Sequence, residues 1–283
     1  MGWNNELAYI WTKMVGPSRP TASELAIYTK YAHMLMNFEK RKLRILILGS
    51  TPEFRDWGYE ENFEVWVMDA NPDYNSAINR ELRHKTILEN AKYKEHYIYE
   101  YWQNLSFEDF FDIIIGDLAI GNIPPNQLES FIQKVSTALT SNGLFLGKSF
   151  FIPKEEIKPI KDVVKEYYSG PLYHPYSALA FHLTMHSLDE NNMLSFQKQY
   201  QLVISLYNDG IINDDTLECF QNVGWDTEMK FHFHVPHIEK YEQLLCKYLT
   251  IYKTEYGQDI YSPFFPLFIV TKQNSICFKE ELI

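Results

Sequence analysis

A continuous apolar run, LRILILG, begins at Leu43 and ends in a glycine. Such a run is typical of a strand covered on both faces, as in the centre of a parallel sheet. Four further strand-like segments follow before residue 152, with helical segments between them and a turn at SNG before the last strand. This alternation predicts an open α/β sheet.

The segments on either side of this alternation have a different character. Two helices are predicted before it, the first over Trp3 to Met14 and the second beginning near Ser23. Only helical segments follow from Pro153 to about Gly224; then come a strand in EMKFHFHV, a helix over IEKYEQLLCKYLTIYK and a last strand in FFPLFIVTK. We therefore predict four parts: an N-terminal helical lid (1–42), an α/β core that binds a cofactor (43–152), a helical cap or insertion (153–225), and C-terminal strands and a helix that complete the sheet (226–283).

The end of the first strand has the features of a ligand site. Ligands of open α/β sheets bind beyond the carboxyl ends of the strands, and Gly49 lets a ligand approach the backbone there. Ser50 to Glu53 read as a helix start with an S-x-x-E capping box, and a helix N-terminus favours an anionic group. Asp69 follows Gly49 by 20 residues, the spacing of an acid that binds ribose. The alternative interpretation of Asp69 is a helix cap.

Two cofactors fit such a turn. A dinucleotide needs further glycines where this chain has Thr51 and Glu53, and a glutamate would repel its pyrophosphate. S-adenosylmethionine carries no phosphate, so its carboxylate and sulfonium make smaller demands on the turn.

With these residues the chain resembles the class I S-adenosylmethionine-dependent methyltransferases, over roughly Arg44 to Phe150. The sequence LILGSTPEFRD corresponds to their first motif, in a divergent LGxTPE form, VWVMDANPDY to the second and FDIIIGDLAI to the fourth. LTSNGLFLGKSF corresponds to the strand after the fourth helix. The resemblance implies a Rossmann-like α/β sheet of about seven strands whose last pair is antiparallel at the edge. It also implies S-adenosyl-L-methionine as the methyl donor and S-adenosyl-L-homocysteine as the product.

The resemblance further implies which residues contact the cofactor. The turn after the first strand would meet the methionine part, Asp69 the ribose, and Tyr101 with Trp102 the adenine. Asp117 would lie near the sulfonium and the methyl acceptor. The predicted cofactor contacts are Gly49, Ser50, Thr51, Glu53, Asp69, Ala70, Asn71, Tyr101, Trp102, Asp117 and Leu118.

The methyl acceptor is predicted to bind the segments outside the α/β core. Arg19 would lie near an anionic group on a lid, and Tyr173, His174 and Tyr176 suit a pocket with an aromatic wall and a few polar groups. Asp117, His182 and His186 are the candidate general bases. The two histidines, spaced i, i+4 on a predicted helix, together with His232 and His234, also permit a metal site; we predict no metal.

Composition narrows the partners and the compartment. Lys plus Arg number 26 against 37 Asp plus Glu, a net charge of −11, and such a field repels a phosphate backbone. We expect a small-molecule or peptide acceptor, no nucleic acid and no membrane. Three scattered cysteines favour a reducing, cytoplasmic location. Two alternatives remain open: an NAD-linked oxidoreductase, and a methyltransferase-like protein that binds the cofactor without transferring a methyl group.

Overall fold

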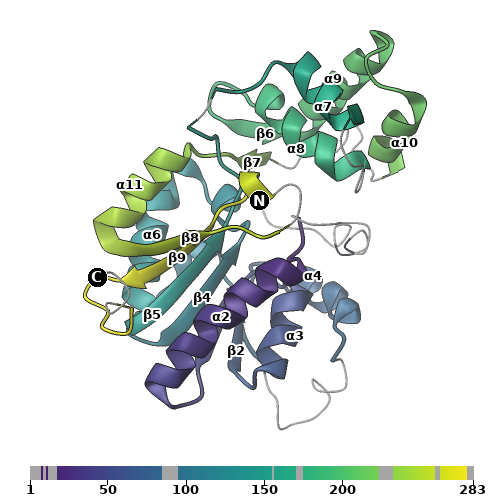
Figure 1. Cartoon of the computed structure of the whole chain (residues 1–283). Coiled ribbons are helices and arrows are strands. Elements are labelled where there is room, and N and C mark those ends of the chain that lie inside the picture. Colours follow the sequence, from purple (N-terminus) through teal and green to yellow (C-terminus); the bar gives the residue numbers. More distant parts are fainter. Residues whose placement is uncertain are drawn as a thin grey trace. The chain divides into compact units, whose positions relative to one another are not determined.

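The structure is a computed structural model that describes residues 8, 11, 18–84, 95–154, 156–169, 175–222, 232–258 and 262–278 (Figure 1). The chain divides into two compact units. One consists of Gly2–Ser149 together with Lys240–Ile283, and the other of Phe150–Glu239. The first predicted helix, over Trp3 to Met14, lies largely outside the described residues.

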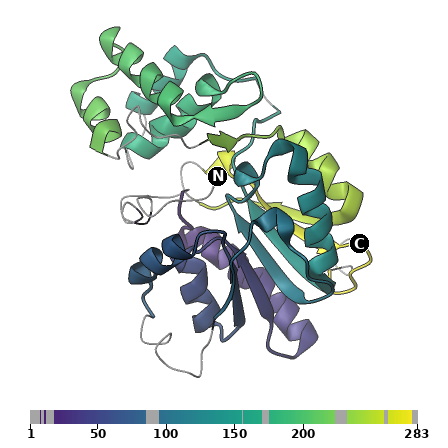
Figure 2. The same cartoon turned by 180° about the vertical axis from the view of Figure 1, so that it is seen from behind.

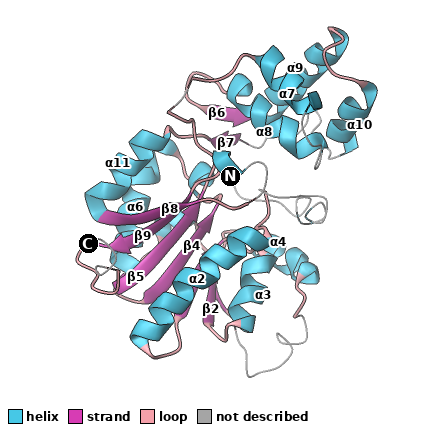
Figure 3. Ribbon diagram, viewed as in Figure 1, coloured by secondary structure: helices cyan, strands magenta, loops and turns pink. Residues whose placement is uncertain are grey.

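A seven-stranded sheet forms the framework of the first unit (Figure 3). Its order is β3-β2-β1-β4-β5-β9-β8, and the first five strands of this order are parallel. β9 runs antiparallel to both of its neighbours. The predicted α/β sheet with an antiparallel pair at one edge is therefore confirmed. The strand bounds are β1 Arg44–Leu48, β2 Glu64–Met68, β3 His96–Ile98, β4 Phe111–Asp117, β5 Leu139–Lys148, β8 Leu249–Glu255 and β9 Leu267–Lys272.

Helices cover both faces of this sheet: α2 and α3 lie on one face, α6 and α11 on the other (Figures 1 and 2). α2 begins after Thr21, whose side chain and that of Glu24 form a reciprocal capping box. It buries Tyr28, Tyr31 and Leu35 in the core beside β1 and β4. The helical segments of this unit are α2 Ala22–Glu39, α3 Pro52–Glu60, α4 Pro72–Ile78, η2 Asn79–Glu81, η3 Trp102–Asn104, η4 Ile120–Asn122, η5 Pro125–Gln127, α6 Leu128–Ala138, α11 Ile238–Tyr248 and η6 Ser262–Phe264.

The second unit is mainly helical. Its described residues form four helices and a two-stranded antiparallel sheet, β6 with β7, so the prediction of helices alone up to Gly224 was wrong. The helices enclose a core of their own that includes Leu179, Leu183 and Val203. The elements are α7 Ile160–Ser169, α8 Pro175–Ser187, β6 Met193–Ser195, α9 Phe196–Asn208, α10 Asp214–Asn222 and β7 His232–His234. Within the described residues, none of the helices is long and apolar enough to cross a membrane.

Two elements in the C-terminal part of the chain also differ from the prediction. The helix expected over residues 238–253 ends at Tyr248, and the chain continues directly as β8. Neither Gly nor Pro marks this change, although TIYKT has strand-like β-branched and aromatic residues. The strand expected in EMKFHFHV is β7, which pairs with β6 and not with the large sheet.

Two turn predictions need correction as well. The SNG sequence lies inside β5, where the register with β4 shifts between Phe111 and Ile113. This irregularity accommodates the extra residues without ending the strand. The capping box expected at Ser50 does not form, because Thr51 is the N-cap of α3 and makes no side-chain cap hydrogen bond.

Candidate functional site

A pocket opens in the first unit at the carboxyl ends of β1, β2 and β4. The space that it bounds is about 410 Å³, which includes open solvent. Seven predicted cofactor residues lie together in its wall. The full lining is Trp11, Ser18, Leu48, Gly49, Ser50, Thr51, Asp69, Tyr74, Trp102, Asp117, Leu118 and Asn122.

Gly49 lies in the wall of the pocket. Its φ of +97° is strained for any residue with a side chain, and a Cβ built there would lie 3.4 Å from Cζ2 of Trp102. The Trp102 indole is held by a 2.7 Å hydrogen bond from its Nε1 to the carbonyl oxygen of Met68. The turn therefore presents bare backbone beside an aromatic wall.

Asp69 is the acid at the end of β2, and it is only 7% exposed. Its Oδ1 accepts from the backbone N–H of Asn71 at 2.9 Å, and its Oδ2 from the hydroxyl of Ser50 at 3.1 Å. Burial raises its pKa, and the hydrogen bonds from Asn71 and Ser50 oppose this rise. Each carboxylate oxygen can accept more than one hydrogen bond, so the group still has capacity for a ligand.

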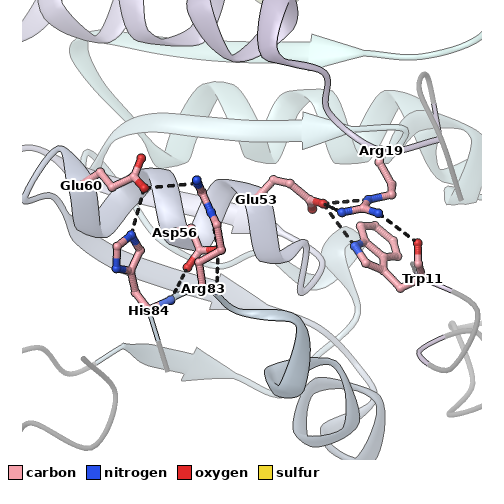
Figure 4. Close-up of polar contacts among 7 residues, drawn as sticks. All are labelled: Trp11, Arg19, Glu53, Asp56, Glu60, Arg83 and His84. Atoms are coloured by element: carbon pink, nitrogen blue, oxygen red, sulfur yellow. Dashed lines mark hydrogen bonds and ion pairs between the residues drawn. The ribbon is translucent and has the colours of Figure 1, made fainter. Parts of the chain in front are cut away.

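Glu53, in the first turn of α3, anchors the segment that precedes α2 (Figure 4). Its Oε1 accepts from Arg19 Nε at 2.8 Å, from Arg19 Nη2 at 2.5 Å and from Trp11 Nε1 at 3.3 Å. The Arg19 guanidinium lies over the Trp11 ring, 5.7 Å from the ring centroid. These contacts hold Trp11 and Ser18 in the wall of the pocket.

Asp117, at the end of β4, belongs to a buried cluster of charged groups. Nζ of Lys148 lies 3.0 Å from Asp117 Oδ1 and 2.8 Å from Glu24 Oε2, and all three side chains are at most 5% exposed. Burial raises the pKa of Asp117 to about 7; Lys148 opposes this rise, and Glu24 with Glu53 adds to it. A carboxylate that titrates near neutral pH is suited to accept a proton.

Leu118 follows with φ +53°, which is uncommon for a bulky residue. Two contacts hold it there: its N–H donates to the carbonyl oxygen of Lys148 at 2.7 Å, and its carbonyl accepts from Asn122 Nδ2 at 2.9 Å. Strained backbone of this kind clusters at binding and catalytic sites.

Four predicted cofactor residues do not line the pocket. Glu53 supports it through Arg19, and the backbone of Asn71 orients Asp69, while Tyr101 is 52% exposed and Ala70 is partly buried. Sequence reasoning missed five wall residues. Leu48 lies in the first motif and Tyr74 in the second, and Asn122 comes two residues after the fourth; the other two are Trp11 and Ser18.

The predicted acceptor residues belong to the second unit, apart from Arg19. Tyr173 and His174 lie outside the described residues, and Tyr176 and His182 lie on α8 with side chains that are not described. Nε2 of His186 is buried and has no hydrogen-bond partner among the described residues. Within that same part of the chain, no group of three His, Cys, Asp or Glu side chains is arranged to hold a metal ion.

Neither a scan against models of protein families nor a search of curated proteins finds a match. Solved structures are similar in fold. A putative zinc-dependent alcohol dehydrogenase from Rhodobacter sphaeroides has a TM-score of 0.56 at 14% identity, over 94% of this chain and 95% of that chain. The PH0226 protein of Pyrococcus horikoshii OT3 has a TM-score of 0.52 at 14% identity, over 96% and 100%.

A putative S-adenosylmethionine-dependent methyltransferase from Listeria monocytogenes has a TM-score of 0.50 at 15% identity, over 87% of this chain and 96% of that chain. Identities this low show likeness of fold alone. The chain thus has the α/β, Rossmann-like fold of that methyltransferase, with seven strands and a reversed strand near one edge.

Proposed function

We propose that this chain is an enzyme that binds S-adenosyl-L-methionine in the pocket and transfers its methyl group to an acceptor. One observation carries the proposal: a single positive-φ glycine, Gly49, is followed by Ser50, which donates to the buried acid Asp69, and then by a helix whose first turn bears Glu53. This arrangement suits a nucleoside that lacks a pyrophosphate. The LGxTPE form of the first motif is part of the same proposal.

The residues in the pocket fit such a cofactor. Asp69 would accept from the ribose hydroxyls, and Trp102, with Tyr101 and Ala70 nearby in the chain, would border the adenine. The bare backbone at Gly49, with Ser50, Thr51 and Leu118, would lie along the remaining part. When bound, the cofactor supplies an electrophilic methyl group on a sulfonium.

The protein's part in the reaction is then mainly orientation. Transfer needs the acceptor atom in line with the methyl group, and a base only if the acceptor must lose a proton. Asp117 is in the pocket wall and has a pKa raised by burial to about 7. We assign it as the proton acceptor for acceptors that need one.

An NAD-linked oxidoreductase is the competing function, and one similar structure is named as an alcohol dehydrogenase. The charge of the pocket wall argues against it. Asp69 and Asp117 both line the pocket, and two carboxylates there would repel a pyrophosphate. Glu53, in the first turn of α3, is paired with Arg19 and lies outside the lining. The third possible function is that of a protein that binds the cofactor without transferring its methyl group. Detection of methyl transfer to any acceptor excludes it.

Calorimetry with S-adenosylmethionine, S-adenosylhomocysteine and NAD tests the proposal directly. We expect the first two ligands to bind and NAD to bind far more weakly. Tighter binding of NAD overturns the proposal. A Glu53→Gln variant sharpens the comparison, because removal of the charge should improve NAD binding more than binding of the other two ligands.

We propose that the acceptor is a small molecule or a peptide and not a nucleic acid. Arg19 pairs with Glu53, so its function would be to hold the lid closed rather than to meet an anionic acceptor. Arg19→Met should therefore weaken cofactor binding severalfold. The cytoplasmic location stays a prediction from cysteine usage.

The predicted acceptor contacts in the second unit are tested by a double change, His182→Ala with His186→Ala. If the histidines serve the acceptor, cofactor affinity stays the same and methyl transfer falls. Tyr176 and the residues at 173–174 are the further candidates for contact with the acceptor. Loss of fold stability on the double change, or on addition of a chelator, would instead indicate a core or metal role.

A further inference from the structure

The charges of the buried cluster formed by Glu24, Lys148 and Asp117 do not sum to zero. Glu24 and Asp117 are two carboxylates, and among the described residues Lys148 is the one cation that lies within 3.0 Å of both. With all three groups ionised, the cluster holds one surplus negative charge. Nearby Glu53 does not change this count, because Arg19 neutralises it.

Water contributes little to stabilising that surplus. The side chains of Lys148 and Glu24 are 0% and 2% exposed, and that of Asp117 is 5% exposed. Tyr28, on the same helix as Glu24, is fully buried, and its hydroxyl has no hydrogen-bond partner among the described residues. Burial raises the pKa of Tyr28, and the charges of Asp117 and Glu24 raise it further. Its hydroxyl therefore stays neutral, and the surplus charge is reduced most readily by a proton on Asp117 or by a cation in the pocket.

The pocket brings a ligand to Asp117 and not to the other members of the cluster. Asp117 is in the pocket wall, whereas Lys148 and Glu24 are not among the lining residues. In the sheet, β1 separates β2 from β4, so Asp69 and Asp117 stand two strand spacings apart, about 10 Å. A cofactor whose ribose is at Asp69 would extend its sulfonium across Gly49 toward Asp117.

We propose that the Glu24–Lys148–Asp117 cluster selects a cationic ligand, so that the pocket binds the sulfonium donor more tightly than the uncharged thioether product and releases a proton as it does so. The inference rests on the proposed function. The proton leaves the Asp117 carboxyl for solvent, and the sulfonium takes its place as the neutralising charge. The product, which has lost the sulfonium charge, no longer holds Asp117 ionised and is released more easily.

The groups that face Asp117 set the pH range of this selection. They are Lys148 on β5, Glu24 and Tyr28 on α2, and Glu53 on α3. The pKa of Asp117 in the free protein is about 7, and a neighbouring cation lowers it. Preference for the charged ligand should therefore grow as pH rises toward 7 and level off above it.

Calorimetry on the full chain, without acceptor, tests the inference with S-adenosylmethionine and S-adenosylhomocysteine from pH 5.5 to 8. As the pH rises toward 7, the ratio of their affinities should shift toward S-adenosylmethionine by as much as about tenfold per pH unit. Comparison of two buffers with different ionisation enthalpies at pH 6.5 should reveal release of up to about three-quarters of a proton with S-adenosylmethionine, and much less with S-adenosylhomocysteine.

Three variants complete the test. Asp117→Asn should abolish the pH dependence of the ratio, and Glu24→Gln should reduce the preference at pH 8, since either change leaves the cluster with one carboxylate for one ammonium. Asp73→Asn, which removes an exposed acid of α4, should leave both unchanged. If neither variant of the cluster folds, proton release by the native protein decides.

The outcomes separate this inference from the proposed function. Binding of both ligands with a ratio that does not change with pH, and with equal proton release, overturns the inference alone. Binding of neither ligand overturns the proposed function and this inference with it.

Discussion

The hydroxyl of Ser50 donates a 3.1 Å hydrogen bond to Oδ2 of Asp69, and so joins the turn after β1 to the end of β2. The backbone N–H of Asn71 holds the other oxygen of the same carboxylate. The acid that we assign to the ribose is thus oriented from two sides before any ligand arrives. Preorganisation of this kind reduces the entropy that a ligand must lose on binding.

Asp69→Ala should weaken S-adenosylmethionine binding by about 1.5–3 kcal/mol, the value of hydrogen bonds to a charged group. Calorimetry should record this as a loss of affinity of tenfold or more. Because the side chain also holds Ser50 and Asn71, we expect a modest fall in the melting temperature as well. Ser50→Ala, which removes one of these supports and leaves the acid, should have a smaller effect. Equal affinity for the native protein and Asp69→Ala would mean that the acid only supports the turn.

Gly49→Ala should cost about 1–3 kcal/mol of folding stability, because φ +97° is strained for alanine. The chain offers a matched control in Gly210, which has φ +69° with nothing within 4 Å of an added Cβ. Both variants should lower the melting temperature. Only Gly49→Ala, whose new methyl group approaches Trp102, should also lower ligand affinity. If the two variants bind ligand equally well, Gly49 is simply a turn.

The contribution of Asp117 to the stability of the ligand-free protein should fall as the pH rises from about 4 to about 7. Its folded-state pKa of about 7 lies above 3.8, the ordinary pKa of an aspartic acid side chain. The folded state thus binds the proton more tightly than the unfolded state, and this stabilisation, complete below the lower value, is lost as pH rises through the higher one. Asp117→Asn should remove this trend and be more stable than the native protein at pH 8. Denaturant titrations at pH 5 and pH 8 measure both effects, and an unchanged pH trend in the variant would contradict the assignment.

A buried ion pair between α3 and the residue before β3 should be one of the most sensitive points of the fold. Arg55 donates to both oxygens of Glu95 at 2.7 and 2.6 Å, and both side chains are 0% exposed. Arg55→Met leaves a buried carboxylate without its cation, so we expect a loss of about 3–5 kcal/mol in denaturant unfolding.

The exposed pair Lys247–Glu129 is the control for this change. Lys247→Met should cost at most about 1 kcal/mol, because water screens an exposed pair. Similar losses for Arg55→Met and Lys247→Met would show that burial of the first pair has little energetic effect.

The sequence predicted the elements that carry strong local signals. β1 and β4 are continuous apolar runs, so the centre of the sheet could be predicted. Asp69 follows Gly49 at the spacing of an acid that ends the second strand, and seven residues of the pocket wall could be predicted as well. The α11–β8 boundary was missed because no glycine or proline interrupts it. The partnership of Glu24 with Lys148 spans 124 residues, and only the completed fold brings such distant side chains together.

The position of β9 between β5 and β8 has a consequence for synthesis on the ribosome. β5 ends at Lys148 and its neighbour begins at Leu267, so the whole helical unit is made before β5 gains its partner. At ordinary translation rates this interval is on the order of ten seconds. Throughout it, the nascent chain presents an unpaired apolar strand edge, the kind of surface that recruits chaperones or other nascent chains. Fragments that stop short of Leu267 should therefore aggregate even though every strand that borders the pocket is already present.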